Sequence, residues 1–161
     1  MLCSGGCYGK GVKRVTQNGL KIRKARLTDA SRIAVLSGQL GYPTTTKEMA
    51  ARLSRALKFT HSACFVAATD EDGVIGWVHV SVTPLLEVPQ RAEVNGLVVD
   101  EKIRSRGAGW ALLEAAEKWA KKMGCAGMSV RSNVIRDRAH SFYLRYGYEH
   151  YKTQKAFRKA L

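Results

Sequence analysis

Apolar and polar positions form a regular series of segments from about residue 20 onward. Alternation with a period of two, or a short apolar run, predicts a strand, and apolar residues three and four apart predict a helix. The predicted strands cover residues 21–25, 63–68, 74–82, 92–99, 127–132 and 149–157. The predicted helices cover about 29–40, 46–57, 107–123 and 137–146. This order of elements indicates one sheet domain of the α/β or α+β class.

The stretch before the first predicted strand has a different character. Residues 1–19 are rich in glycine and lack hydrophobic periodicity, so we expect a flexible N-terminal extension at 1–19 and a domain at 20–161. No stretch approaches the ~20 apolar residues of a membrane helix. We expect no membrane segment, no signal peptide and a cytoplasmic location.

The charge of the chain is strongly positive and unevenly distributed. The net charge is +14, and the excess cations lie mainly in residues 1–28 and 131–161, whereas the stretch between them is close to neutral. A basic chain suggests nucleic acid as a partner. The cations are not interleaved with aromatic residues in a stripe on which bases would stack, and this argues against a nucleic-acid partner.

The segment Glu93–Gly109 joins a predicted strand to the clearest predicted helix through a loop with two arginines and two glycines. The first turn of a helix presents unpaired backbone N–H groups and a partial positive charge, which together attract anions. Gly107 and Gly109 allow a phosphate to approach the backbone. Arg104 and Arg106 supply charge-assisted hydrogen bonds. The segment predicts a phosphate-binding turn; the alternative is a glycine-containing loop that only turns the chain.

Arg-x-x-Gly-x-Gly, at Arg104, Gly107 and Gly109, resembles the acetyl-coenzyme A signature of the GNAT acetyltransferase superfamily. A second segment, Arg138–Tyr148, is similar to the later Ala-x-x-x-Tyr segment of that family, which is followed by Gly and an aromatic residue. The resemblance covers about residues 20–161. It implies a GNAT-like α+β fold in three layers, with a mixed, mostly antiparallel sheet flanked by helices. It also implies an N-acetyltransferase that uses acetyl-coenzyme A and no metal.

The resemblance further implies which residues hold acetyl-coenzyme A. In this fold a splayed central strand pair admits the pantetheine arm, which pairs with the backbone of Leu97, Val98 and Val99. A glycine inside a strand, here Gly96, independently suggests a bulge or a close approach. The pyrophosphate would lie on Arg104, Ser105, Arg106, Gly107, Ala108 and Gly109. The family often has Asn where this chain has Arg136, so whether Asn133 or Arg136 contacts the cofactor is left open.

The chemistry also needs a proton acceptor, because an alkyl amine with a pKa of about 10 is mostly protonated at pH 7. Glu93 is the candidate general base, and its spacing before Arg104 resembles that in family members with a glutamate base. Strand alternation places Glu93 and Asn95 on one face. Leu97 and Val99 are predicted to follow on the same face, toward a common cleft. The alternative is a strand-end carboxylate paired with Arg91.

Tyr143 matches the tyrosine that, in the family, protonates the departing coenzyme A thiolate. Its alternative role is structural, because Ala139, Phe142, Tyr143 and Tyr146 lie at helical spacing and would form an aromatic core stripe. The sequence does not suggest a covalent acetyl-cysteine step. We therefore expect direct transfer in a ternary complex.

The acceptor is predicted to bind at the two early helices and the loop at 84–89. Candidate lining residues are Tyr42, Trp77, Leu85, Leu86 and Glu87. The expected acceptor is a primary amine of a small molecule, aminoglycoside-like or polyamine-like. A protein or peptide amine is one alternative, and a catalytically inactive, basic nucleic-acid-binding module is another. A homodimer is left open.

Overall fold

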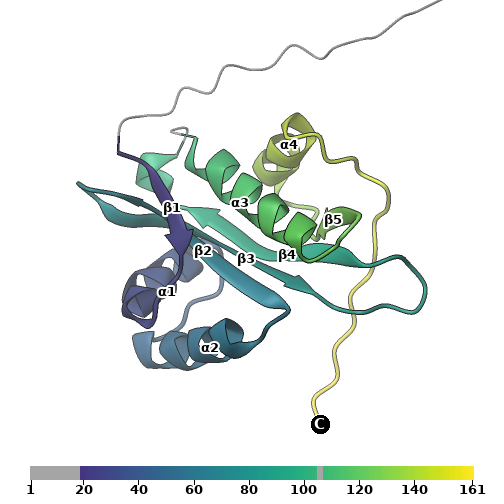
Figure 1. Cartoon of the computed structure of the whole chain (residues 1–161), viewed down its shortest axis with the longest axis horizontal. Coiled ribbons are helices and arrows are strands. Elements are labelled where there is room, and N and C mark those ends of the chain that lie inside the picture. Colours follow the sequence, from purple (N-terminus) through teal and green to yellow (C-terminus); the bar gives the residue numbers. More distant parts are fainter. Residues whose placement is uncertain (1–18, 105–106) are drawn as a thin grey trace, which may run out of the picture.

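The computed structural model describes residues 19–104 and 107–161 (Figure 1). The strands are β1 (Lys21–Lys24), β2 (Ser62–Thr69), β3 (Gly73–Val82), β4 (Arg91–Val99) and β5 (Gly127–Val130). The α-helices are α1 (Ala30–Gln39), α2 (Thr46–Lys58), α3 (Ala108–Lys122) and α4 (Asp137–Arg145). Short 3-10 turns, η1 (Leu27–Asp29) and η2 (Glu101–Ile103), precede α1 and α3. The predicted series is confirmed up to the last helix. The extension expected at 1–19 lies, apart from Gly19, outside the described residues.

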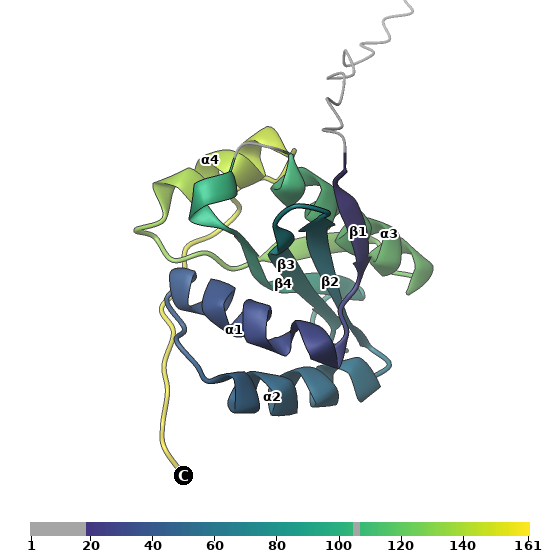
Figure 2. The same cartoon turned by 90° about the vertical axis from the view of Figure 1, so that its left-hand side faces the viewer.

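The five strands form one sheet in the order β1-β2-β3-β4-β5. Neighbouring strands are antiparallel from β1 to β4, and β4 and β5 are parallel. Figure 2 shows α1 and α2 on one face of the sheet and α3 and α4 on the other. The mixed, mostly antiparallel sheet and the three layers agree with the predicted fold class. None of the helices in the described parts of the chain is long and apolar enough to cross a membrane.

Each face of the sheet has its own hydrophobic core. The larger core lies under α3, where apolar side chains of β3 and β4 meet Leu112, Leu113 and Ala116. The smaller core lies under α1 and α2 and includes Leu36 and Leu53. Because strand side chains alternate between faces, membership of these two cores shows which face each residue of β4 points toward.

α2 begins where the sequence indicated, at an N-terminal cap. The hydroxyl of Thr45 accepts a hydrogen bond from the backbone N–H of Glu48 at 3.2 Å, and the Glu48 carboxylate accepts one from the Thr45 N–H at 3.1 Å. This reciprocal capping box satisfies N–H groups that the first helical turn leaves without acceptors.

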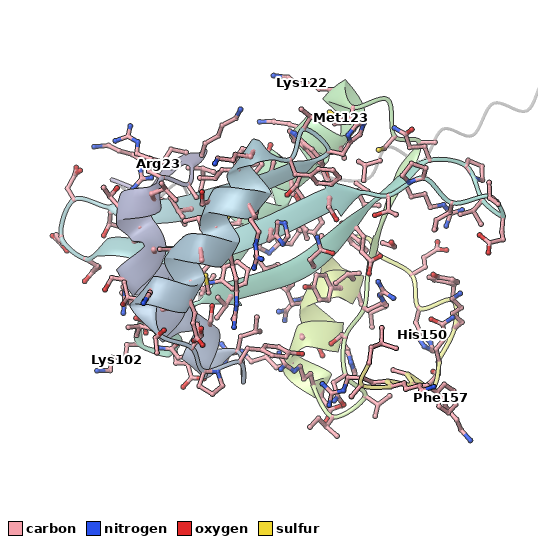
Figure 3. The ribbon with its side chains drawn as sticks, turned by 90° about the horizontal axis from the view of Figure 1, so that it is seen from below. Arg23, Lys102, Lys122, Met123, His150 and Phe157 are labelled. Carbon is pink, nitrogen blue, oxygen red and sulfur yellow. The ribbon has the colours of Figure 1, made fainter. Side chains whose placement is uncertain are left out.

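The strand predicted at 149–157 does not form. Residues 149–161 are all described, and every one of them is exposed and outside regular structure. Figure 1 shows this segment running from α4 past the sheet to the C-terminus, and Figure 3 shows His150 and Phe157 on the outside. The segment buries too little apolar surface to hold a strand in place, since Tyr151 and Phe157 are 67% and 90% exposed.

Candidate active site

β4 changes its pairing halfway along its length. Its first half, Arg91–Val94, pairs with all of β5 on one side, and residues 92–94 pair with β3 on the other. Its second half, 97–99, pairs with β3, and the ladder with β5 does not extend to it. In the described part of the chain, the second half therefore has no partner strand on the β5 side, and this side is called its free edge.

A β-bulge separates the two halves. Across the strand pair, His79 stands opposite Gly96 and Val80 stands opposite Val94, which leaves Asn95 as the extra residue. A bulge bends the strand that carries it and interrupts its ladder. The bulge or close approach predicted from Gly96 is confirmed.

The bulge also changes the face toward which the side chains point. Ala92 and Val94 belong to the core under α3, and Leu97 and Val99 pack against that same core. Glu93, between Ala92 and Val94, therefore points to the opposite face, toward the layer of α1 and α2. The prediction that Glu93 shares a face with Leu97 and Val99 is wrong, because one inserted residue shifts the alternation.

Gly96 lies under a tryptophan. A Cβ atom on Gly96 would stand 2.8 Å from two ring carbons of Trp77 and 3.7 Å from Cδ2 of Leu40, the C-cap residue of α1. Trp77 belongs to the smaller core, and among the described residues its buried Nε1 has no hydrogen-bond partner. The close approach at the bulge thus requires a residue without a side chain, and Trp77 forms the packing above it.

Polar side chains gather around Glu93. The Glu93 carboxylate forms an ion pair with Nε of Arg131, the residue after β5, rather than with Arg91. The Glu93 side chain is 30% exposed and that of Arg131 is 79% exposed. Beside them, Nδ2 of Asn95 donates to Oγ of Ser81 at 2.7 Å. Glu93, Asn95 and Ser81 form the polar patch of this sheet face.

A second polar pair, which the sequence analysis missed, continues the polar patch along β3. His79 and Ser81 alternate with the core residues of this strand, and Nε2 of His79 lies 2.9 Å from Oγ of Ser62 on β2. Burial lowers the pKa of His79, which favours the neutral imidazole at pH 7. The signal available in the sequence was a polar residue at every second position of an otherwise apolar strand.

Of the phosphate turn predicted before α3, the structure describes Gly107 and the helix that follows it. Gly107 is the N-cap of α3 with φ +78°, and nothing lies within 4 Å of the position of an added Cβ. This left-handed conformation strongly favours glycine. The N-terminal N–H groups of the helix follow at once, so the turn is suited to an anion. Ser105 and Arg106 lie outside the described residues.

The next residues of α3 pack inward. Ala108 is buried, and a Cβ on Gly109 would lie 3.3 Å from the ring of Phe142 on α4. Because Gly109 has no side chain, α4 can pack closely on the first turn of α3.

Arg104 lies against the end of β4. Its Nη2 atom is 3.0 Å from a carboxylate oxygen of Glu101, and its Nε donates to the Val99 carbonyl at 3.3 Å. The guanidinium thus lies between the end of β4 and η2.

Asp100 ties α1 to the end of β4. Its buried carboxylate accepts a hydrogen bond from the backbone N–H of Lys102 at 3.0 Å and forms an ion pair with Arg32. Gln39 completes the contact, because its Oε1 accepts from the Glu101 N–H at 3.0 Å. The bond from Lys102, followed by that from Arg32, holds the pKa of Asp100 below its ordinary value of 3.8.

Tyr143, on α4, belongs to an aromatic cluster. Its ring centre is 5.3 Å from that of Phe142 and 5.6 Å from that of Tyr148. Burial raises the pKa of Tyr143 to about 12, against the opposing effect of the Arg136 cation. The phenol is therefore protonated at pH 7. Tyr143 has the packing role that the sequence left as an alternative, and its hydroxyl also has the protonation state of a proton donor.

Asn133 and Arg136, the two candidates for a cofactor contact before α4, have different surroundings. Oδ1 of Asn133 accepts from the Ile135 N–H at 3.2 Å, within its own loop. Arg136 reaches out of the loop, and its Nη2 donates to the Leu40 carbonyl at the end of α1 at 2.6 Å. Arg136 therefore links the layer of α1 to α4.

Two observations test whether the site fits coenzyme A. The second half of β4 offers a free backbone edge that can pair with the amides of a pantetheine arm. The open, left-handed turn at Gly107 leads to the N-terminus of a long helix, which suits a pyrophosphate. These residues fit the cofactor. Among the described residues, no group of three His, Cys, Asp or Glu side chains is placed to hold a metal ion.

Comparisons with known proteins agree with this geometry. The chain is 26% identical over 146 residues to an aminoglycoside N(6')-acetyltransferase type 1 from Klebsiella aerogenes, covering 87% of this chain and 96% of that protein. The solved aminoglycoside N-acetyltransferase AAC(6')-Iy in complex with CoA superposes with a TM-score of 0.80 at 21% identity, covering 92% of this chain and all of that one.

A third similar structure is glucosamine-6-phosphate N-acetyltransferase from Arabidopsis thaliana, with a TM-score of 0.74 at 20% identity over 86% of this chain and 97% of that one. At such identities the structures show a common fold. The model of the acetyltransferase (GNAT) family matches residues 31–148, from α1 to just beyond α4. The chain belongs to the GNAT family and is an N-acetyltransferase that uses acetyl-coenzyme A.

Proposed function

We propose that this enzyme acetylates a primary amine of a small molecule, aminoglycoside-like or polyamine-like, by direct transfer in a ternary complex. The observation that carries the proposal is the polar patch of Glu93, Ser81 and the bulge residue Asn95, on the face toward α1 and α2. Hydroxyl, amide and carboxylate groups suit a hydroxylated or cationic amine. The similarity to an aminoglycoside N(6')-acetyltransferase over nearly its whole length supports the same acceptor class.

Acetyl-coenzyme A supplies the acetyl thioester. In this proposal the free edge of residues 97–99 holds the pantetheine arm. The pyrophosphate lies on the N–H groups that follow Gly107, with Arg104 beside it. Ser105 and Arg106 complete this set by their positions in the motif. Asn133, exposed in the loop before α4, is the remaining candidate contact.

The proposed reaction moves two protons. Glu93 accepts a proton from the acceptor ammonium, directly or through a water, and the neutral nitrogen forms a bond to the acetyl carbon. The carbon–sulfur bond then breaks, and the electron pair leaves on the thiolate of coenzyme A. Tyr143 donates its phenolic proton to that sulfur, and the second proton lost by the acetylated nitrogen returns through water to the phenolate of Tyr143. Transfer is direct, and no acetylated side chain forms.

A turnover screen tests the acceptor class. Release of free thiol from acetyl-coenzyme A is measured with aminoglycosides, polyamines, amino acids and short peptides. We expect release with small-molecule amines and none with peptides. Turnover of peptides instead would favour a protein acceptor. Absence of turnover with any amine, together with strongly salt-dependent binding to nucleic acid, would favour the catalytically inactive basic module.

The role of Glu93 is tested by removing its charge. Glu93→Gln should lower kcat by about 10²–10⁴-fold, because the amide accepts no proton from the amine. Arg131→Gln is the matched control, since it breaks the same ion pair but leaves the carboxylate. We expect kcat to be largely retained in the control. Equal kcat values for Glu93→Gln and the wild type would remove Glu93 as the base.

Tyr143 is tested in the same way. Tyr143→Phe keeps the ring in the aromatic cluster and removes the proton donor, so kcat should fall by about 10²-fold. Tyr148→Phe is the control, because Tyr148 lies in the same cluster and its buried hydroxyl has no hydrogen-bond partner among the described residues. An equal loss in both variants would assign the effect to packing.

A further inference from the structure

Arg136 connects parts of the chain that lie far apart in sequence. It is the N-cap residue of α4, and its guanidinium donates a hydrogen bond to the Leu40 carbonyl at 2.6 Å. The same group approaches Gly41, where an added Cβ would lie 3.6 Å from Nη2 of Arg136. Leu40 in turn lies beside Gly96 at the bulge. A continuous contact therefore runs from α4 through the end of α1 to the bulge of β4.

The physical basis of this contact favours arginine. The last carbonyls of a helix have no partners within the helix and carry a partial negative charge, so a cation binds well at the end of α1. Arginine offers several N–H donors on a long side chain, which allows it to cross from one layer to another. Lysine can supply the charge, and glutamine can supply a shorter neutral donor.

The contact joins the two sides of the proposed active site. Glu93, the proposed base, lies on the face of the sheet toward α1, and Tyr143, the proposed acid, lies on α4. In Figure 3, α1 and α2 lie in front of the sheet, whereas α4 belongs to the layer behind it. Arg136 also acts on Tyr143 directly, because its positive charge opposes the rise in the pKa of that phenol.

We propose that Arg136 is a positioning residue that fixes the end of α1 against the start of α4 and so sets the separation of the acceptor from the proton donor Tyr143. The inference rests on the proposed function, which places the acceptor beside the polar patch. The proposal predicts that a change at Arg136 affects the binding of the amine but not the binding of acetyl-coenzyme A. Loss of the contact loosens the acceptor side of the site, whereas the edge of β4 and the turn at Gly107 keep their hold on acetyl-coenzyme A.

Kinetics of three variants test this role. Arg136→Gln should raise the KM for the amine and lower kcat, each by about tenfold, with the KM for acetyl-coenzyme A within about twofold of the wild type. Arg136→Lys should recover part of the loss because it keeps the charge. Arg138→Gln, an exposed position on the same helix, loses the same charge and should match the wild type.

The opposite pattern would overturn the proposal. A rise in the KM for acetyl-coenzyme A alone would assign Arg136 to the cofactor, and a lower melting temperature with unchanged kcat and KM values would make its role purely structural. A loss of the same size in Arg138→Gln would reduce the effect to net charge.

Hydrogen exchange gives a readout that does not require turnover. In Arg136→Gln, backbone amides of 38–45 and of 133–143 should both exchange about tenfold faster, because one contact holds both segments. Exchange unchanged in either segment would overturn the proposal, even if no amine were found to be a substrate. If exchange rises in both segments while the wild type acetylates no amine tested, the contact stands and the proposed function fails.

Discussion

The two halves of β4 share β3 as a neighbour and differ on the opposite side of the strand. The first half has a neighbour on each side and alternates regularly between buried residues and the polar patch, while the second half has a free edge on the β5 side. The bulge at Asn95 and Gly96 separates them. In the proposed mechanism the base belongs to the first half and the cofactor pairs with the second. The comparison teaches that a sheet can build a site by interrupting one ladder rather than by adding a loop.

The largest effect on stability and activity is expected from a substitution of Gly96, where the two halves of β4 meet. Gly96→Ala would place a methyl group 2.8 Å from the ring of Trp77, so the indole or the strand must move. We expect the free energy of unfolding to fall by about 1–3 kcal/mol. Activity should fall by about 10²-fold, because the thioester and the acceptor would be misaligned. Denaturant titration and thiol release measure the two effects.

Gly127→Ala is the control for this experiment. Gly127 lies on β5 opposite the first half of β4, and nothing stands within 4 Å of its added Cβ. Both quantities should stay near the wild type. If Gly127→Ala lowered stability and activity as much as Gly96→Ala, the sheet would tolerate no added methyl group at either position. The proposed difference between the two halves of β4 would then be contradicted.

A smaller effect is expected at the two ends of α3. Gly107 follows the second half of β4 with φ +78°, and Gly124 leads toward β5 with φ +76°; both have open space around the added Cβ. Replacement by alanine should therefore lower the free energy of unfolding by about 1–2 kcal/mol at either position. Only Gly107→Ala should raise the KM for acetyl-coenzyme A, by about tenfold. Equal KM values would place the pyrophosphate elsewhere.

The smallest effect is expected on the pH dependence of stability. It concerns Asp100, directly after β4, and Asp29, at the start of α1. The pKa of each buried carboxyl lies below its ordinary value of 3.8, that of Asp29 chiefly through the Arg23 guanidinium. The stabilisation by each ionised carboxyl is complete above the ordinary pKa and is lost as the pH falls from that value through the lowered pKa of the folded protein. Asp100→Asn and Asp29→Asn should therefore each flatten the acid limb of the stability profile.

Only one of these variants should affect the cofactor. Asp100→Asn should raise the KM for acetyl-coenzyme A a few-fold, because Asp100 holds the turn that leads to Arg104. Asp29→Asn provides the matched loss of an ion-paired carboxylate outside that turn. A rise of the same size in both variants would show that the effect is one of general stability.

The sequence predicted the elements well because each has a local signal. The capping box at Thr45 marks the start of α2, and the apolar stripe of α3 needs no knowledge of distant residues. The strand predicted after α4 shows the limit of such signals. Alternation indicates that a segment can be a strand, but a neighbouring edge and enough buried apolar surface decide whether it becomes one.

The site was less predictable, because its geometry depends on register. Gly96 signalled a bulge or a close approach, yet the change of face that this entails for Glu93 follows only once the pairing with His79 and Val80 is known. The ion pair of Glu93 with Arg131 depends on the parallel placement of β5. Arg136 was recognised as a departure from the family pattern, but its partner Leu40 is distant in sequence.

The parallel pair formed by β4 and β5 also bears on how the protein folds. The antiparallel strands β2, β3 and β4 follow one another in the chain and form by short-range closure, whereas β5 reaches β4 only after the whole of α3 has been crossed. Pairing between segments so distant in sequence carries a larger entropy of loop closure and is slow. The pairing of β4 with β5, like the equally long-range pairing of β1 with β2, is therefore expected to form after the β2-β3-β4 hairpins, and the point at which β4 parts from β5 is completed only then.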